Sequence, residues 1–253
     1  MFPFLSLFKG VFSMKDRADK HAGVSYDEGL RSYFIGIFNR MGLGLLITAL
    51  VAFMLPVVVP GIEAAIGGGT FFWVWIAAVV VELILVFLIA GKALTGSYSA
   101  SKATGMFYIY AALNGFTLLP ILFHYTAASA ALAFLSAASV FAGAALYGYT
   151  TKKDITGWGN ILFMGLIGLI VAMVLNIFIG SGMMDMVISA AAVLLFTALT
   201  AWDMQTLKLF YYEEGEGNPE RAGQLAAYGA LSLYLDFINL FVHLLRLIGV
   251  SRD

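Results

Sequence analysis

The chain has no cysteine, which excludes disulfide bonds, thiolate chemistry and cysteine-ligated metal sites. Charged residues are also scarce: they make up 11% of the 253 residues, whereas soluble domains carry roughly 25%. Hydrophobic residues make up 61%, and the mean hydropathy is +0.92. A soluble fold of this length cannot hide so much apolar surface. The sequence therefore predicts a membrane protein throughout, with no separate soluble domain.

Further absences exclude several kinds of chemistry. No lysine follows Lys208, so the last helix cannot form the Schiff base of a seven-helix photoreceptor. The histidines at 21, 124 and 243 are scattered, which argues against a zinc site. The run around Asp236 lacks the glycine-rich partner sequence that an intramembrane aspartyl protease carries. We therefore expect no enzyme activity, no cofactor and no nucleic-acid partner.

Seven apolar runs are long enough to cross a bilayer, which takes about 20 mostly apolar residues in a helix. They lack barrel-like alternation, so all are predicted to be helices, and turn-forming residues separate most of them. Residues 1–38 are predicted to form a cytoplasmic tail, and residues 39–250 a seven-helix transmembrane domain. The predicted spans are residues 40–60, 71–91, 104–124, 128–148, 159–180, 184–208 and 225–248.

Basic residues predict the orientation of these spans. Lysine and arginine occur in the N-terminal tail and in the second-to-third, fourth-to-fifth and sixth-to-seventh connections, and the alternate connections have none. By the positive-inside rule, the N-terminus lies in the cytoplasm. A full seventh crossing puts the C-terminus outside, whereas a re-entrant seventh segment returns it to the cytoplasm. No cleavable signal peptide is apparent, and this pattern suits a bacterial inner membrane.

Two aspartates stand out within apolar runs, Asp203 on the sixth span and Asp236 on the seventh, and Glu82 lies in the middle of the second. A carboxylate at mid-bilayer depth costs roughly 2.5–3.5 kcal/mol on insertion scales, and usually faces a bundle interior or a pathway. Two carboxyl groups brought close together do not both ionise easily, and they titrate as a unit. Loss of a shared proton would push the helices apart or draw in a cation. We expect a pH-sensing gate at this pair; the alternative is two separate structural carboxylates.

The seventh span carries a polar stripe. At about 100° per residue, its members fall within an arc of about 80°. A lipid-facing helix would not tolerate the stripe, so this helix is predicted to lie at the centre, with the other six wrapped around it. Each member taken alone has a simpler interpretation, such as a hydrogen bond to a neighbouring helix, a core histidine or an arginine at the headgroups. The stripe consists of Ser232, Asp236, Asn239, His243 and Arg246.

Two segments resemble signatures of the Bax-inhibitor-1 family. Residues 200–208, around Asp203, resemble the sixth-helix signature of that family, and residues 230–241, around Asp236, resemble its seventh-helix signature. Arg246 follows the second signature at the expected offset, and residues 31–41 resemble the lead into the first span. The hydropathy profile matches over nearly the whole chain beyond residue 25.

The resemblance implies a fold of two three-helix groups around a central C-terminal helix. It also implies a calcium leak that is gated by pH through paired aspartates. Carried over, the pair is Asp203 and Asp236, which are also candidate calcium contacts. Glu82 and Arg246 match a further acidic and basic pair.

The same resemblance bears on the residues around the pair. Asn239 and His243 would line a supporting polar pathway with Glu82 and Arg246. Bacterial relatives have an arginine near the cytoplasmic end of the second helix that latches one aspartate. The nearest basic residue here is Lys92, whose ammonium lacks the bidentate geometry of an arginine.

The residues alone support a proton-sensitive intramembrane site, and calcium enters only from the resemblance. Calcium favours several oxygen ligands, and the chain has no compact calcium-loop motif. The leading hypothesis is a pH-sensitive calcium leak, and the alternative is a non-conducting regulator that binds a protease or a cell-death factor. A proton-coupled transporter ranks lower, because no pair of discontinuous helices occupies matching positions in two halves. The expected partners are the lipid bilayer, calcium and possible membrane proteins.

Overall fold

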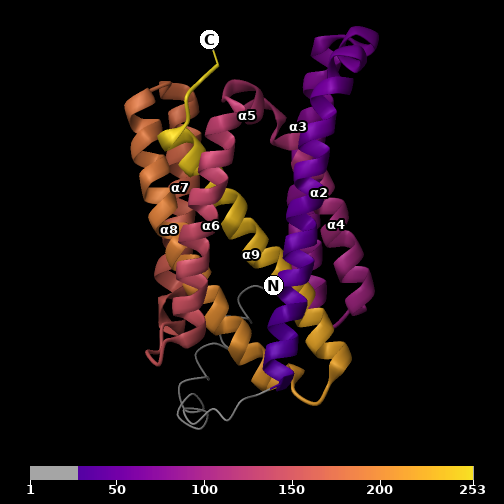
Figure 1. Ribbon diagram of the computed structural model, residues 1–253, viewed down its shortest axis with the longest axis vertical. Helices are drawn as coiled ribbons and strands as arrows, with labels where there is room; N and C mark the ends of the chain where they lie inside the picture. The colour runs from indigo at the N-terminus through magenta and orange to yellow at the C-terminus, as the bar shows by residue number, and fades with distance from the viewer. Residues whose placement is uncertain (1–27, 253) are drawn as a thin grey trace. The chain divides into compact units, whose positions relative to one another are not determined.

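The computed structural model describes residues 28–252, except for the side chains of residues 62–66. Most of the predicted cytoplasmic tail lies outside this range. The described chain is helical, with short connections (Figure 1). The long helices are α2 (Glu28–Ile66), α3 (Gly68–Leu94), α4 (Ala100–Thr117), α6 (Ala127–Thr150), α7 (Gly159–Ile179), α8 (Gly182–Phe210) and α9 (Pro219–Ile248). The short ones are α5 (Leu119–His124), η3 (Thr156–Trp158) and the π-helical turn η4 (Tyr211–Gly215).

Seven helical stretches of the described chain are long and apolar enough to cross a membrane, and they correspond in order to the predicted spans. The third stretch joins α4 and α5, from Ala100 to His124. The seventh is the continuous 30-residue helix α9, about 45 Å long at 1.5 Å per residue. A helix of this length can span the roughly 30 Å hydrocarbon core of a bilayer. The prediction of an integral membrane protein with seven spans is confirmed.

The first helix extends beyond the predicted span on its N-terminal side. Helix α2 begins at Glu28, whereas the predicted span begins at residue 40, and the start of the transmembrane domain at residue 39 stays a prediction. Its first turns bury Leu30, Tyr33, Phe34 and Ile37, which follow the spacing of one helical face. Charged residues on the other face of these turns lower the average hydropathy, so a search for apolar runs misses them.

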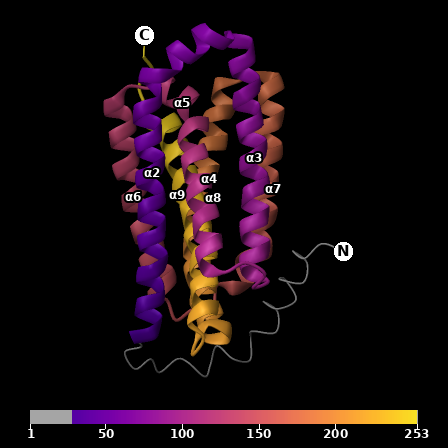
Figure 2. The same cartoon turned by 90° about the vertical axis from the view of Figure 1, so that its right-hand side faces the viewer.

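The far end of α2 is bent. Pro56 and Pro60 lie inside the helix, and each removes a backbone donor and crowds the preceding turn. Figure 2 shows this end of α2 turning over toward the start of α3. Gly67 joins the two helices with φ +81°, a left-handed backbone conformation that glycine adopts without strain.

The chain forms two compact units, and α9 contributes to both. The α6–α8 unit holds residues 127–212 and residues 235–251, which are the second part of α9. The α2–α5 unit holds residues 29–126 and residues 213–234, which include the first part of α9. Half of the most apolar stretch of α9 is buried, against a third or less in every other span. This shared, buried C-terminal helix agrees with the central position that the polar stripe predicts.

Small residues allow close packing within the α6–α8 unit, in which α8 packs against both α6 and α7 (Figure 1). A Cβ atom at Gly148 of α6 would lie 2.2 Å from the carbonyl oxygen of Ala201 on α8. The second part of α9 packs through Phe237, whose ring contacts the rings of Phe134 and Phe141 on α6. Close backbone approach of this kind is a main source of helix association in membranes.

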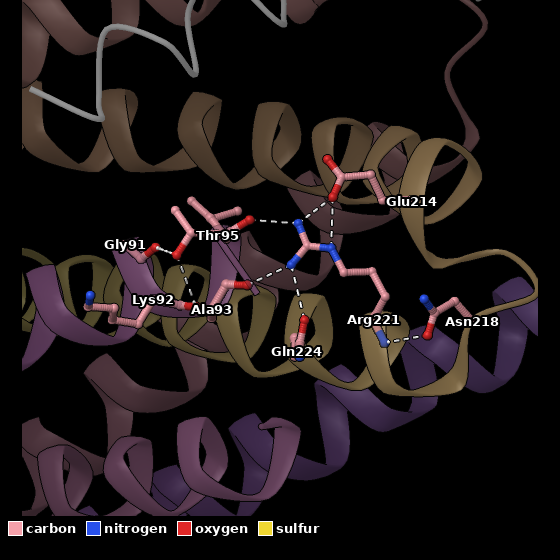
Figure 3. A network of polar contacts seen from close by, with 9 residues as sticks. Gly91, Lys92, Ala93, Thr95, Glu214, Asn218, Arg221 and Gln224 are labelled. Carbon is pink, nitrogen blue, oxygen red and sulfur yellow. Dashed lines mark hydrogen bonds and ion pairs between the residues drawn. The ribbon is translucent and has the colours of Figure 1, made fainter. Parts of the chain in front are cut away.

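The first turns of α9 hold the connection between α3 and α4 in the α2–α5 unit. Arg221 donates to the carbonyl oxygens of Ala93 (2.8 Å) and Leu94 (2.6 Å), at the end of α3 (Figure 3). It also pairs with Glu214, in the turn before α9. Glu220 accepts from the backbone N–H of Ala100 (2.8 Å), at the start of α4. Because helix ends leave backbone groups without partners, these contacts cap both helices.

Replacing Arg221 by alanine is expected to lower the free energy of unfolding by roughly 1.5–3 kcal/mol, the range for hydrogen bonds to a charged group. Arg221→Lys should lie between the alanine variant and the wild type, because an ammonium cannot reach two carbonyl groups and a carboxylate in one plane. Unfolding by dodecyl sulfate in mixed micelles measures the difference. Lys153→Ala, at an exposed loop position, is the control. Equal stability of Arg221→Ala and the control would contradict the capping role.

Candidate intramembrane acidic site

Asp203 and Asp236 lie in the same unit. Helix α8 carries Asp203, with 7% of its surface exposed, and the second part of α9 carries Asp236, with 4% exposed. Asp203 is a titratable neighbour of Asp236. The two carboxyl groups come from α8 and α9, so their separation depends on how these two helices pack.

The surroundings of Asp236 leave its carboxyl group incompletely paired. Thr200, one turn before Asp203 on α8, is a hydrogen-bond partner of Asp236. The Thr200 hydroxyl also lies 2.8 Å from the carbonyl oxygen of Phe196, to which it donates. The Oδ2 atom of Asp236 is buried and has no hydrogen-bond partner among the residues that the structure describes. An oxygen of this kind is uncommon in folded proteins and is suited to carry a proton or to contact a cation.

Two other members of the stripe have local partners. His243 is 3% exposed; its Nδ1 lies 3.3 Å from the Ser189 hydroxyl, and its ring stacks on that of Phe196. Asn239 donates from Nδ2 to the carbonyl oxygen of Leu235 on its own helix (2.8 Å). Both side chains therefore have partners inside the α6–α8 unit that satisfy at least part of their hydrogen-bonding capacity.

Arg246 forms an ion pair with Asp185, in the first turn of α8, at 3.0 Å. Both side chains are partly exposed, at 33% and 41%. Glu82 lies in the other unit, so a pairing of Arg246 with Glu82 stays a prediction. Asp185 is the second residue of the predicted span 184–208, and sequence reasoning did not single it out. Its position at the start of the sixth span, together with that of Arg246 near the end of the seventh, was the available signal.

Glu82 and Lys92 both lie on α3, in the α2–α5 unit. Glu82 is 8% exposed and accepts a hydrogen bond from the Thr117 hydroxyl (2.8 Å). Lys92 is exposed in the last turn of α3, and within residues 28–252 its ammonium group forms no ion pair. Arg221, which sequence reasoning did not single out, is the basic side chain that contacts the end of α3.

A metal centre needs several ligands close together. In the part of the chain that the structure describes, no group of three or more histidine, aspartate or glutamate residues lies close enough to hold a metal ion.

Comparison with known proteins gives close matches over nearly the whole chain. A family model described as "Inhibitor of apoptosis-promoting Bax1" matches residues 30–253. The chain is 38% identical to the inner membrane protein YbhL of Escherichia coli K12 over 224 residues, which cover 88% of this chain and 94% of YbhL. It is 40% identical to the membrane protein SpyM3_0260 of Streptococcus pyogenes over 225 residues, with the same coverage. It is 37% identical to protein RP147 of Rickettsia prowazekii over 236 residues, which cover 90% of this chain and 94% of RP147.

Proposed function

The chain belongs to the Bax-inhibitor-1 family, and from that premise we propose that it is a pH-sensitive leak for calcium, gated by Asp203 and Asp236. The observation that carries the proposal is the pair of buried acidic residues in one unit, with a carboxyl oxygen of Asp236 left without a hydrogen-bond partner among the described residues. The seven spans make the lipid bilayer the environment in which the pair works.

The gate would work through one shared proton. With that proton bound, the pair carries a single negative charge. Without it, two negative charges face each other in a place where water is scarce, and their repulsion is stronger there than in solution. The repulsion is relieved if the helices separate or if a cation enters. Calcium suits the second route because it accepts carboxylate oxygens in irregular arrangements.

The remaining polar residues of the stripe would continue the path from the pair. Asn239, His243 and Arg246 follow Asp236 along α9 at helical spacing. Glu82 is a further acidic group in the other unit, and Lys92, in the last turn of α3, is the candidate for a latch. We place the protein in a bacterial inner membrane, with its N-terminus in the cytoplasm, because of the basic connections and the name of the YbhL relative.

A second function remains a candidate because of the description of the family. An inhibitor of a pro-apoptotic factor can act by binding a partner without conducting ions. This chain would then be a regulator of another membrane protein, and its acidic pair would set the conformation that the partner meets.

Calcium flux into proteoliposomes that contain only the purified protein separates the two functions. We expect a flux whose rate changes with pH, and we expect Asp236→Asn to remove that change. Asp154→Asn, at an exposed loop position, is the matched control and should behave as wild type. A flux whose pH dependence survives in Asp236→Asn would contradict the site. Absence of flux at every pH would contradict the leak and favour the regulator.

A further inference from the structure

A second buried acidic group lies outside the aspartate pair. Glu82 is on α3, in the α2–α5 unit, with 8% of its surface exposed. Its Oε1 accepts from the Thr117 hydroxyl at 2.8 Å, and the Asn114 side chain is a second hydrogen-bond partner. Both partners are neutral and both come from α4. The carboxyl group is thus held in a defined place by two donors.

Among the residues that the structure describes, no basic side chain forms an ion pair with Glu82. Within the described residues, the ion pairs between side chains are Arg221 with Glu214 and Arg246 with Asp185. Among the described residues, Glu82 has the phenol groups of Tyr110 on α4 and Tyr234 on α9 as titratable neighbours. Both phenols are buried, and neither can supply a positive charge. A buried carboxylate without a cation is costly, and the usual way to remove the cost is to bind a proton.

The same contacts connect Glu82 to two more helices. The Tyr234 hydroxyl donates to Oδ1 of Asn114 at 3.0 Å, and it lies 2.5 Å from the Thr48 hydroxyl on α2. Tyr234 is fully buried, and Asn114 and Thr48 are nearly so. The edge of its ring faces those of Phe107 and Tyr110, which fixes its direction. The Asn114 amide therefore connects the carboxyl group of Glu82 to Tyr234 on α9 and, through the Tyr234 hydroxyl, to Thr48 on α2.

We propose that Glu82, with Thr117, Asn114 and Tyr234, forms a second proton-binding site of this protein, separate from the aspartate pair. The carboxylate oxygen takes a proton from water, and the acid returns it to water, so no other reactant is needed. In the charged form, the carboxylate accepts from Thr117 and Asn114. In the neutral form, the carboxyl group has an O–H donor of its own, and the hydrogen bond that it accepts from the Asn114 amide weakens. The position of that amide then changes its hydrogen bond with the Tyr234 hydroxyl, so α9 responds to the protonation state of Glu82. This site does not depend on the proposed calcium leak.

Infrared difference spectra of the protein in liposomes, taken between an acidic and an alkaline buffer, test the proposal. A protonated carboxyl group gives a carbonyl band that disappears when the proton leaves. We expect at least two components in the wild type. Glu82→Gln should remove one of them and retain the other, and Asp203→Asn/Asp236→Asn should do the reverse. Asp154→Asn, at an exposed loop position, should leave both components in place.

A second variant keeps the test decisive if Glu82→Gln fails to fold. Thr117→Val keeps the carboxyl group and removes the donor to Oε1, so it should shift the frequency of the Glu82 component alone. Identical spectra for wild type, Glu82→Gln and Thr117→Val would overturn the proposal. Loss of both components in the double aspartate variant would also overturn it, because the site would then not be separate. Spectra that match the expectation without any calcium flux would uphold this site and contradict only the leak.

Discussion

Replacing Gly148 by alanine is expected to destabilise the protein by about 3 kcal/mol, at the upper end of the range for overpacked interiors. The added Cβ would lie 2.2 Å from the carbonyl oxygen and 2.8 Å from the carbonyl carbon of Ala201. These are backbone atoms of a neighbouring helix, which cannot turn aside as the end of a flexible side chain can. Helices α6 and α8 must therefore move apart. The van der Waals contacts between the two helices are then lost, and no hydrophobic effect compensates for them, because lipid is as apolar as the helix surfaces.

Gly143→Ala is the matched control for this prediction. It lies on the same helix, and a Cβ there would meet nothing within 4 Å. Unfolding in mixed micelles should therefore give wild-type stability or slightly higher, because alanine favours a helix by up to about 1 kcal/mol over glycine. Ala201 is two residues before Asp203, so Gly148→Ala should also disturb the pH response of any flux. Equal stability of the two variants would show that α6 and α8 are not in close contact.

Loss of either aspartate is expected to remove most of the pH dependence of calcium flux. Asparagine has nearly the shape of aspartate and carries no titratable proton, so Asp203→Asn and Asp236→Asn change the charge with little change in packing. Each leaves one carboxyl group that has no acidic partner with which to share a proton. Thr200→Val should have a smaller effect and shift the midpoint of the response, because it removes a hydrogen-bond partner of Asp236. Proteoliposome flux over a pH series measures all three variants.

Much of the architecture could be predicted from the sequence. The spans followed from long apolar runs, because a bilayer demands about 20 apolar residues in a helix whatever their packing. The buried position of α9 followed from its polar stripe, since five polar residues on one face cannot point into lipid. The candidate pair followed from the same rule, applied to single acidic residues inside apolar runs.

The partners of the polar residues could not be predicted, because they depend on which helices meet and at what depth. Arg246 pairs with Asp185, 61 positions earlier in the chain, and Arg221 donates to Ala93, 128 positions earlier. Neither separation is visible in hydropathy or spacing. The contact of Thr200 with Asp236 was easier to predict, because Thr200 lies one turn from Asp203 and so faces the same side of α8.

The most direct measurement of the central claim is a double-mutant cycle on the pH dependence of calcium flux, with Asp203→Asn, Asp236→Asn and the two combined. Two carboxyl groups that share a proton act as a unit, so the combined variant should lose no more of the response than either single variant does. If each substitution removes its own part of the response and the two parts add up in the combined variant, the carboxyl groups titrate independently and the proposed gate is contradicted.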